Sequence, residues 1–418
     1  MDNSDILDEV FKNFFNNVYV FKDREVLRHN YLPDKLPHRE EQIRRLGQTV
    51  APVLKNARSS NIFIYGKTGT GKTAVTKYVL NHLEAKAKMI NAAVRFCYVN
   101  CRLAGTEYRV FASLCQSVGV SVPFTGLSVG EVFDRFCTGL DSSRIIFIIA
   151  LDEVDSLVKA RGDILLYELT RINETLQDSK VSLVGISNDL RVKEFFDPRV
   201  LSSLSEEEIV FRPYDASELR NILFDRAQLA FCDGALSEGA LSLCAALAAA
   251  EHGDARRALD LLRVAGEVAE RTGVNAVVED HVREAERLIE HNRVVEALKN
   301  LTLHSKLVVL SVFHLGKANG HKAVTGEINE VYNELCGELG IDPLTQRRLC
   351  SLINELDALG MLNAQVVSMG RYGRTKKIRL EVARTLVREV FSSDNRLGRL
   401  IDYEPKSIKN VSGGKELN

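Results

Sequence analysis

The segment Gly66–Thr73, GKTGTGKT, has the glycine spacing and the lysine-threonine ending of a phosphate-binding loop. A strand-like run precedes it and a helix-like run follows, and this context disfavours the alternative of a glycine turn with a solvated lysine. In such a loop backbone N–H groups surround the phosphates, the lysine neutralises their charge, and the threonine hydroxyl binds Mg²⁺. We therefore predict nucleotide contacts from Gly66, Lys67, Thr68, Gly69, Thr70, Gly71, Lys72, Thr73 and Ala74.

The run IIFIIALDEVD places two acids, Asp152 and Glu153, at the end of a strongly aliphatic strand. A lone acidic pair after a strand is often only solvated. A phosphate-binding loop about 80 residues upstream instead favours a metal and water site. We predict that Asp152 and Thr73 hold Mg²⁺ and that Glu153 polarises the attacking water.

Three further polar residues are candidates for catalysis beside the γ-phosphate. Asn188 ends the strand-like run VSLVGISND and could orient the water, although an isolated asparagine there is more often a turn residue. Arg199 could complete the γ-phosphate site of its own chain or of a neighbour, and its alternative is a surface salt bridge. Arg256 begins a helix-like run and could link a helical lid to the phosphates.

These residues need a parallel sheet to position them. Near-continuous aliphatic runs alternate with helix-like stretches up to about residue 213, which predicts an α/β domain with both sheet faces covered. After residue 213 the spacing of the apolar residues is that of helices. The predicted strands are 61–66, 95–100, 145–153 and 181–189. The predicted organisation is a lead-in over 1–30, the α/β domain over 31–212, a helical lid over 213–292, a third domain over 293–395 and a polar tail over 396–418.

Composition is that of a globular protein, with 45% hydrophobic and 27% charged residues and a formal net charge of −1. Any surface that binds nucleic acid must therefore come from a local concentration of basic residues. The eight cysteines include no CxxC pair, which argues for free thiols in a reducing compartment rather than a zinc ribbon. Without a membrane-length apolar run or a signal-peptide pattern, we expect a soluble intracellular protein, cytoplasmic and associated with the nucleoid.

Basic charge is concentrated near the C-terminal end. Between Thr345 and Leu380 there are seven basic and two acidic residues. The run TQRRLCSLINELDALG has one apolar helix face, and Arg347 and Arg348 lie in its first turn, off that face. The N-terminal turns of a recognition helix reach base edges, and arginine reads guanine well.

Two strand-like runs, 363–369 and 375–382, flank the glycine-tipped stretch GRYGR. Together with the preceding helices they predict a winged helix, and the wing tip would present Arg371, Tyr372 and Arg374 to DNA. The alternative is a winged helix that binds protein and whose charges are only solvated.

The order and spacing of the loop, the acidic pair and the three candidate residues resemble AAA+ ATPases over about residues 30–290. The resemblance implies a five-stranded parallel sheet with a helical lid, and the roles of Walker A, Walker B, sensor 1 (Asn188), arginine finger (Arg199) and sensor 2 (Arg256). It also implies an adenine-side set, for which we take Leu32, Pro33, His38, Arg39, Tyr214 and Arg226.

From end to end the chain resembles the archaeal origin recognition complex subunit 1 / cell division control protein 6 family of replication initiators. Blocks such as FKDREVLRHNYLPDKLPHRE and GDARRALDLLRVAGEVAE carry the likeness. The family implies binding of double-stranded origin DNA, recruitment of the minichromosome maintenance helicase, and ATP and ADP as the states of a switch. It also implies a DNA-touching insertion near residues 121–136, possible pairing with paralogous initiators, and a monomer in solution that can assemble on DNA.

Three alternative functions must be distinguished from replication initiation. A clamp-loader subunit would need a C-terminal collar and usually shows an SRC motif, where this chain has DPRVLSS. A transcription-regulating NTPase would commonly carry repeats, which we do not find. A DNA-binding module with a degenerate nucleotide site is opposed by the intact Lys72, Asp152 and Glu153.

Overall fold

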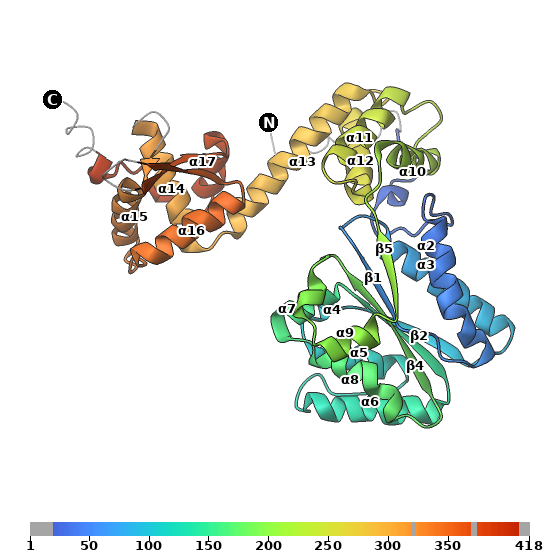
Figure 1. Cartoon of the computed structure of the whole chain (residues 1–418). Helices are drawn as coiled ribbons and strands as arrows, with labels where there is room; N and C mark the ends of the chain where they lie inside the picture. Colours follow the sequence, from blue (N-terminus) through green and yellow to red (C-terminus); the bar gives the residue numbers. More distant parts are fainter. Residues whose placement is uncertain (1–19, 319–322, 369–373, 409–418) are drawn as a thin grey trace, which may run out of the picture. The chain divides into compact units, whose positions relative to one another are not determined.

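The computed structural model describes residues 20–318, 323–368 and 374–408. The chain forms two compact units, residues 1–285 and residues 286–418 (Figure 1). In the part of the chain described, no helix has the length and apolar character needed to cross a membrane.

The first unit is built on a parallel sheet of five strands in the order β2-β3-β4-β1-β5. The strands are β1 (Ile62–Gly66), β2 (Val94–Asn100), β3 (Ile146–Asp152), β4 (Lys180–Ser187) and β5 (Glu207–Phe211). All seven residues of β3 are buried, which explains its uninterrupted apolar run. The sequence pattern located the first four strands. The fifth, EEIVF, was implied only by the family resemblance, because two glutamates obscure it.

Helices cover both faces of this sheet and enclose two apolar clusters (Figure 1). One face carries α2 (Glu40–Val50), the short η2 (Ala51–Lys55) and α3 (Lys72–Met89). The other face carries α4 (Cys101–Ala104), α5 (Glu107–Ser117), α6 (Val129–Ser143), α7 (Val154–Arg161), α8 (Ile164–Arg171) and α9 (Pro198–Leu204), with the short turns η3 (Ile172–Glu174) and η4 (Val192–Phe195).

A helical lid follows the sheet within the same unit. It contains α10 (Ala216–Ala230), α11 (Glu238–Ala250) and α12 (Ala255–Arg271), and α13 (Glu279–Asn300) runs across the boundary between the two units. The segment before residue 31 is not only a polar lead-in, since Val20, Phe21, Val26 and Leu27 are buried, the last two in η1 (Glu25–Leu27). Phe21 packs on Phe231 with ring centroids 4.8 Å apart, so this segment belongs to the lid.

The second unit has the helix and strand order of a winged helix. It contains α14 (Leu303–Ala318), β6 (Ala323–Val324), α15 (Thr325–Leu339), α16 (Gln346–Ala358), β7 (Leu362–Ser368), β8 (Arg374–Leu380) and α17 (Arg384–Ser392). The three strands form an antiparallel sheet in the order β6-β8-β7. Apolar residues from all of these helices join one core.

The segment after Asn395 differs from the predicted polar tail. Leu397, Leu400 and Ile401 are at most 2% exposed and belong to the core of the second unit, around the short η6 (Gly398–Leu400). The chain is then fastened further by Glu334 on α15, whose carboxylate accepts hydrogen bonds from the Tyr403 hydroxyl and from the Ser407 N–H. Sequence reasoning missed this packing because the three apolar residues, although at the helical spacing i, i+3 and i+4, span only one short turn in a polar stretch.

We predict that Leu400→Ala, made in the full chain, lowers the free energy of unfolding of the second unit by about 2–5 kcal/mol, because it leaves a cavity in the core. Arg396→Ala, an exposed neighbour, is the control and should change it by less than about 0.5 kcal/mol. Urea unfolding followed by circular dichroism measures both. Equal stability of the two variants would mean that this segment is indeed a tail.

Candidate functional site

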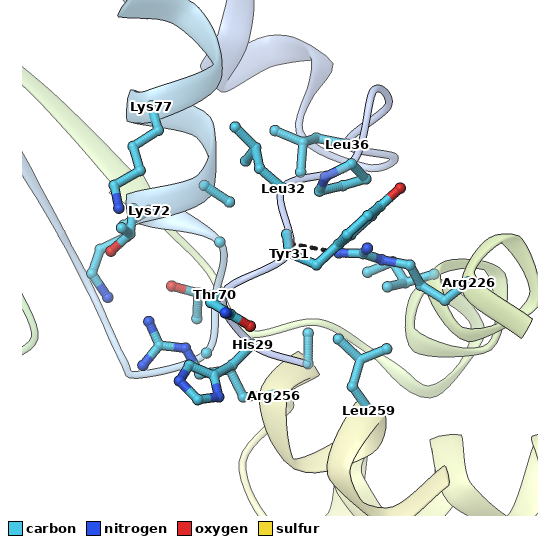
Figure 2. A pocket seen from close by; sticks show the side chains of 18 of the residues that line it. His29, Tyr31, Leu32, Leu36, Thr70, Lys72, Lys77, Arg226, Arg256 and Leu259 are labelled. Carbon is cyan, nitrogen blue, oxygen red and sulfur yellow. Dashed lines mark hydrogen bonds between the residues drawn. The ribbon is translucent and has the colours of Figure 1, made fainter. Parts of the chain in front are cut away.

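A pocket of about 510 Å³ opens at the carboxyl edge of the sheet. Figure 2 shows Lys72 and Lys77 entering it from α3, Arg226 from α10, and Arg256 and Leu259 from α12. The segment 28–37 forms another part of the wall. The pocket therefore lies between the α/β core, the segment before α2 and the lid, all within the first unit.

The glycines of the loop between β1 and α3 are required by its geometry. Gly69 and Gly71 have φ of +69° and +90°, a region that side chains disfavour. A Cβ on Gly66 would lie 2.4 Å from the carbonyl oxygen of Phe211, so β5 approaches the loop too closely for any other residue. This backbone leads into the N-terminus of α3, where N–H groups are available to an anion.

Lys72 is 4% exposed, and its Nζ donates to the carbonyl oxygens of Gly66 at 2.8 Å and Lys67 at 2.6 Å. Burial, opposed by the charge of Asp152 and reinforced by that of Arg256, lowers the pKa of the ammonium to about 8. A buried ammonium held only by carbonyls has a strong electrostatic preference for an added anion.

Asp152 lies at the end of β3 and is 3% exposed. Its Oδ2 accepts hydrogen bonds from the Thr73 hydroxyl and the Tyr98 hydroxyl, both at 2.6 Å, and its Oδ1 accepts one from the Glu153 N–H at 2.8 Å. A carboxylate beside a hydroxyl, next to a phosphate-binding loop, is a donor set that Mg²⁺ accepts when phosphates and water supply the other ligands. Thr73 and Asp152 thus fit the predicted metal site.

Glu153 follows directly, with a strained φ of +53° at the point where β3 ends and α7 begins. Asn100 at the end of β2 donates its amide to Glu153 Oε1 at 3.3 Å, and Arg102 lies 3.6 Å from Oε2. Sequence analysis missed these two partners, because only the pairing of Asn100 with Asp152 in the sheet brings them to the acid.

Asn188 lines the pocket at the end of β4, and its backbone N–H donates to Asp155 Oδ1 at 3.0 Å. Ser187 donates to the same carboxylate oxygen at 3.1 Å. Asp155 therefore fixes the strand end from which the Asn188 side chain projects, beside Glu153 and Asp152 in the pocket wall.

The lid contacts the phosphate-binding loop directly. The Ala255 N–H at the start of α12 donates to the Gly69 carbonyl at 3.1 Å, and Asp254 caps this helix by accepting from the Arg256 N–H. A Cβ on Gly69 would lie 1.7 Å from Asp254, which is a second reason for glycine there. Arg256 consequently lies in the pocket wall, close enough to Lys72 to affect its pKa.

The adenine-side residues fall into two groups. Leu32, Pro33, Tyr214 and Arg226 line the pocket, whereas His38 and Arg39 do not. Arg226 donates to the carbonyls of Val26 and Tyr31, and its guanidinium lies 4.5 Å from the Tyr31 ring centroid. It therefore holds the segment that forms this wall, as Figure 2 shows for the bond to Tyr31.

Arg39 lies beneath the loop instead of facing the pocket. It is 1% exposed and donates to the carbonyls of Thr70, His38 and Arg212 at 2.8–2.9 Å. Its guanidinium stacks on Tyr214, 3.7 Å from the ring centroid. His38 contacts Asn221 of α10 at 3.2 Å. Both residues join the α/β core to the lid.

Several predicted contacts are not in the wall of this pocket. Gly66, Lys67 and Thr68 form the start of the loop but do not line it, whereas Gly69 to Ala74 do. Arg199 is exposed on α9 and lies 3.5 Å from Asp197, outside the pocket of its own chain. Lining residues that sequence analysis did not select include His29, Tyr31, Leu36, Lys77, Ile222 and Leu259.

In the second unit Arg347 and Arg348 are exposed in the first turn of α16. Thr345 caps the helix by accepting from the Arg348 N–H, and Arg348 lies 3.2 Å from Glu355. Lys376 on β8 contacts Asn354 of the same helix. Arg371 and Tyr372 lie outside the described residues. The strand β8 begins at Arg374, whose side chain also lies outside the described part of the structure.

Three protein-family models match consecutive parts of the chain. They are an AAA domain over residues 56–191, the Cdc6 AAA+ ATPase-type lid domain over 220–287 and the CDC6 C-terminal winged helix domain over 296–390. These matches agree with the sheet, the lid and the winged helix described above.

The chain is 51% identical over 404 residues to an ORC1-type DNA replication protein of Pyrococcus abyssi, covering 96% of each sequence. It is 50% identical over 395 residues to that of Thermococcus onnurineus, covering 94% of this chain and 95% of the relative.

Two solved structures are informative. The Aeropyrum pernix ORC1 protein in complex with DNA has a TM-score of 0.83 and 50% identity, over 91% of this chain and 99% of that one. The Aeropyrum pernix ORC2 protein in ADPNP-ADP complexes, at 22% identity and a TM-score of 0.59, covers 94% of this chain and 100% of its own and shares the fold. With half of all positions identical over nearly its whole length, the chain belongs to the family of ORC1-type DNA replication proteins.

Proposed function

We propose that this chain is an ATP-dependent replication initiator. It binds double-stranded origin DNA through the winged helix and the AAA+ module and recruits the minichromosome maintenance helicase. The observation that carries the proposal is the pairing, in one chain, of a phosphate-binding loop bonded to Asp152 with an arginine-led helix in a winged-helix unit. The DNA-bound relative at 50% identity supports the same function.

ATP, with Mg²⁺ held by Thr73 and Asp152, is the proposed ligand of the pocket. The loop N–H groups and Lys72 bind the phosphates, and Leu32, Pro33, Tyr214 and Arg226 form the wall on the adenine side. When bound, Mg²⁺ supplies charge neutralisation on the phosphates. Glu153 accepts a proton from the attacking water, and Asn188 orients that water.

Hydrolysis to ADP and phosphate acts here as a slow switch. Arg256 comes from the lid, so a contact to the γ-phosphate would tie the lid to the nucleotide state. The exposure of Arg199 and its position outside its own pocket favour action on a neighbouring chain over action in its own site. The protein is then a monomer in solution that assembles on DNA, alone or with paralogous initiators.

The proposed domains are the α/β domain over 31–212, the lid over 213–292 and a DNA-binding domain that starts at 293 and continues to 408, because the core includes Ile401. In the DNA-binding domain Arg347 and Arg348 read the major groove, and Arg371, Tyr372 and Arg374 contact DNA from the wing. The insertion over 121–136 is a further DNA contact of the AAA+ module.

DNA footprinting with the full chain tests this function. The wild type should protect repeated elements at a replication origin, whereas a transcription regulator would protect promoters. Arg347→Ala/Arg348→Ala should weaken binding by at least tenfold and reduce the salt dependence, since two phosphate or base contacts are lost. Arg396→Ala, which removes one exposed positive charge in the same unit, is the control for a loss of charge away from this helix. Equal protection by the double variant would contradict the assigned DNA-binding helix.

We expect Glu153→Gln to lower ATP turnover by about 10²-fold or more, because the amide cannot accept the proton of the water. ATP affinity should stay within a few fold, since the loop and Asp152 are intact. Glu174→Gln, an exposed glutamate outside the pocket, is the control. Phosphate release and nucleotide binding measure the two effects. Unchanged turnover would remove Glu153 from the catalytic site.

The pKa of Lys72, about 8 in the free protein, predicts proton uptake on nucleotide binding at alkaline pH. Phosphate charge raises this pKa, so at pH 9 binding should take up about one proton, and at pH 7 almost none. Affinity should accordingly fall by up to about tenfold per pH unit above pH 8. Calorimetry in buffers of different ionisation enthalpy measures the uptake. A constant affinity between pH 7 and pH 9.5 would contradict the assignment.

A further inference from the structure

We propose that Tyr98 is a positioning residue for the metal site, which holds the Asp152 carboxylate in its metal-binding orientation. This inference rests on the proposed nucleotide and Mg²⁺ site. Tyr98 was not among the residues that the sequence pattern singled out, because RFCYVN resembles an ordinary buried strand.

The register of the sheet explains how a tyrosine on β2 reaches an acid on β3. Tyr98 pairs with Ala150, and Asn100 pairs with Asp152, in the parallel ladder. Because side chains two apart share a face, Tyr98, Ala150 and Asp152 lie on the same face, which α3 covers. Ala150 is small, so the phenol ring can extend along the sheet by about two residues, roughly 6.6 Å, to the carboxylate.

The two donors on Asp152 Oδ2 have different origins. Thr73 comes from the phosphate-binding loop and is itself a candidate metal ligand, whereas Tyr98 comes from the sheet and donates its hydroxyl at 2.6 Å. The tyrosine bond therefore fixes the carboxylate independently of the loop. With Asp152 only 3% exposed, little water is available to take over this role.

The ring of Tyr98 is itself held on both sides. It packs against the apolar cluster beneath α3, and the Nζ of Lys77 lies 4.1 Å from its centroid. Removing a fixed hydrogen-bond donor beside a metal-binding carboxylate typically lowers the metal affinity by 10–100-fold.

The chain offers a closely matched control. Tyr65, on β1 of the same sheet, also donates its hydroxyl to a carboxylate, Glu208, at 2.7 Å, but it lies outside the pocket. Tyr98→Phe and Tyr65→Phe each remove one phenol oxygen and keep the ring. A purely structural hydroxyl would therefore affect both variants in the same way.

The test measures ADP binding to the full chain by calorimetry, first in EDTA and then at increasing Mg²⁺. In EDTA the wild type and both variants should bind ADP alike. The Mg²⁺ concentration that gives half of the affinity gain should rise 10–100-fold in Tyr98→Phe and by less than about twofold in Tyr65→Phe. Thermal unfolding of both variants shows whether each is folded.

A Mg²⁺ midpoint for Tyr98→Phe within about twofold of the wild type, in a folded variant, would overturn the inference. So would a wild-type affinity for ADP that does not depend on Mg²⁺, or an equal shift in both variants. Failure of the proposed function is a different result, because then the wild type itself would not bind ADP in EDTA.

Discussion

The buried guanidinium of Arg39 is the interaction on which the architecture of the first unit depends. Its hydrogen bonds reach the start of α2, the phosphate-binding loop and the residue after β5, and its face stacks on Tyr214 at the entrance to the lid. A charge buried this deeply costs several kcal/mol unless its donors are satisfied. The loop, the sheet edge and the lid are consequently held in one arrangement, since a shift of any of them would leave a buried cation without partners.

The parts of the fold that could be predicted are those where local pattern and tertiary environment agree. The aliphatic run of β3 and the glycine-rich turn before α3 each depend on a constraint that is visible within a few residues, namely burial on both faces and positive φ. The strand β5 and the packed segment around Leu400 were missed from the residues alone. Their burial is decided by neighbours distant in sequence, and neither the two glutamates of EEIVF nor the single apolar turn in RLGRLIDYEP gives a pattern long enough to identify it.

The same distinction holds within the site. Two motifs supply Lys72, Thr73, Asp152 and Glu153. Each motif depends on one strand and the turn that follows it, so the proximity of these residues could be predicted. Tyr98, Asn100 and Arg39 reach the site only through the sheet register and the position of β5. His38 and Arg39 were predicted to contact the base, yet the pattern HRE indicates only that two polar side chains precede a helix, and not which way they face.

These contacts also explain how phosphate binding can affect the position of the lid, outside the pocket. Lys72 donates to the carbonyls of Gly66 and Lys67, and an anion that draws the ammonium away leaves both carbonyls without that donor. Further along the loop, the carbonyls of Gly69 and Thr70 are already bonded to Ala255 of the lid and to Arg39. An adjustment of the loop backbone therefore acts directly on the bonds to Ala255, at 3.1 Å, and to Arg39, at 2.9 Å. A ligand shifts a conformational equilibrium only through contacts that differ between the two states. In this chain the carbonyls of Gly66 and Lys67 lie two to four residues from those of Gly69 and Thr70, so the loop backbone itself offers a route from phosphate binding to the lid, separate from any contact by Arg256.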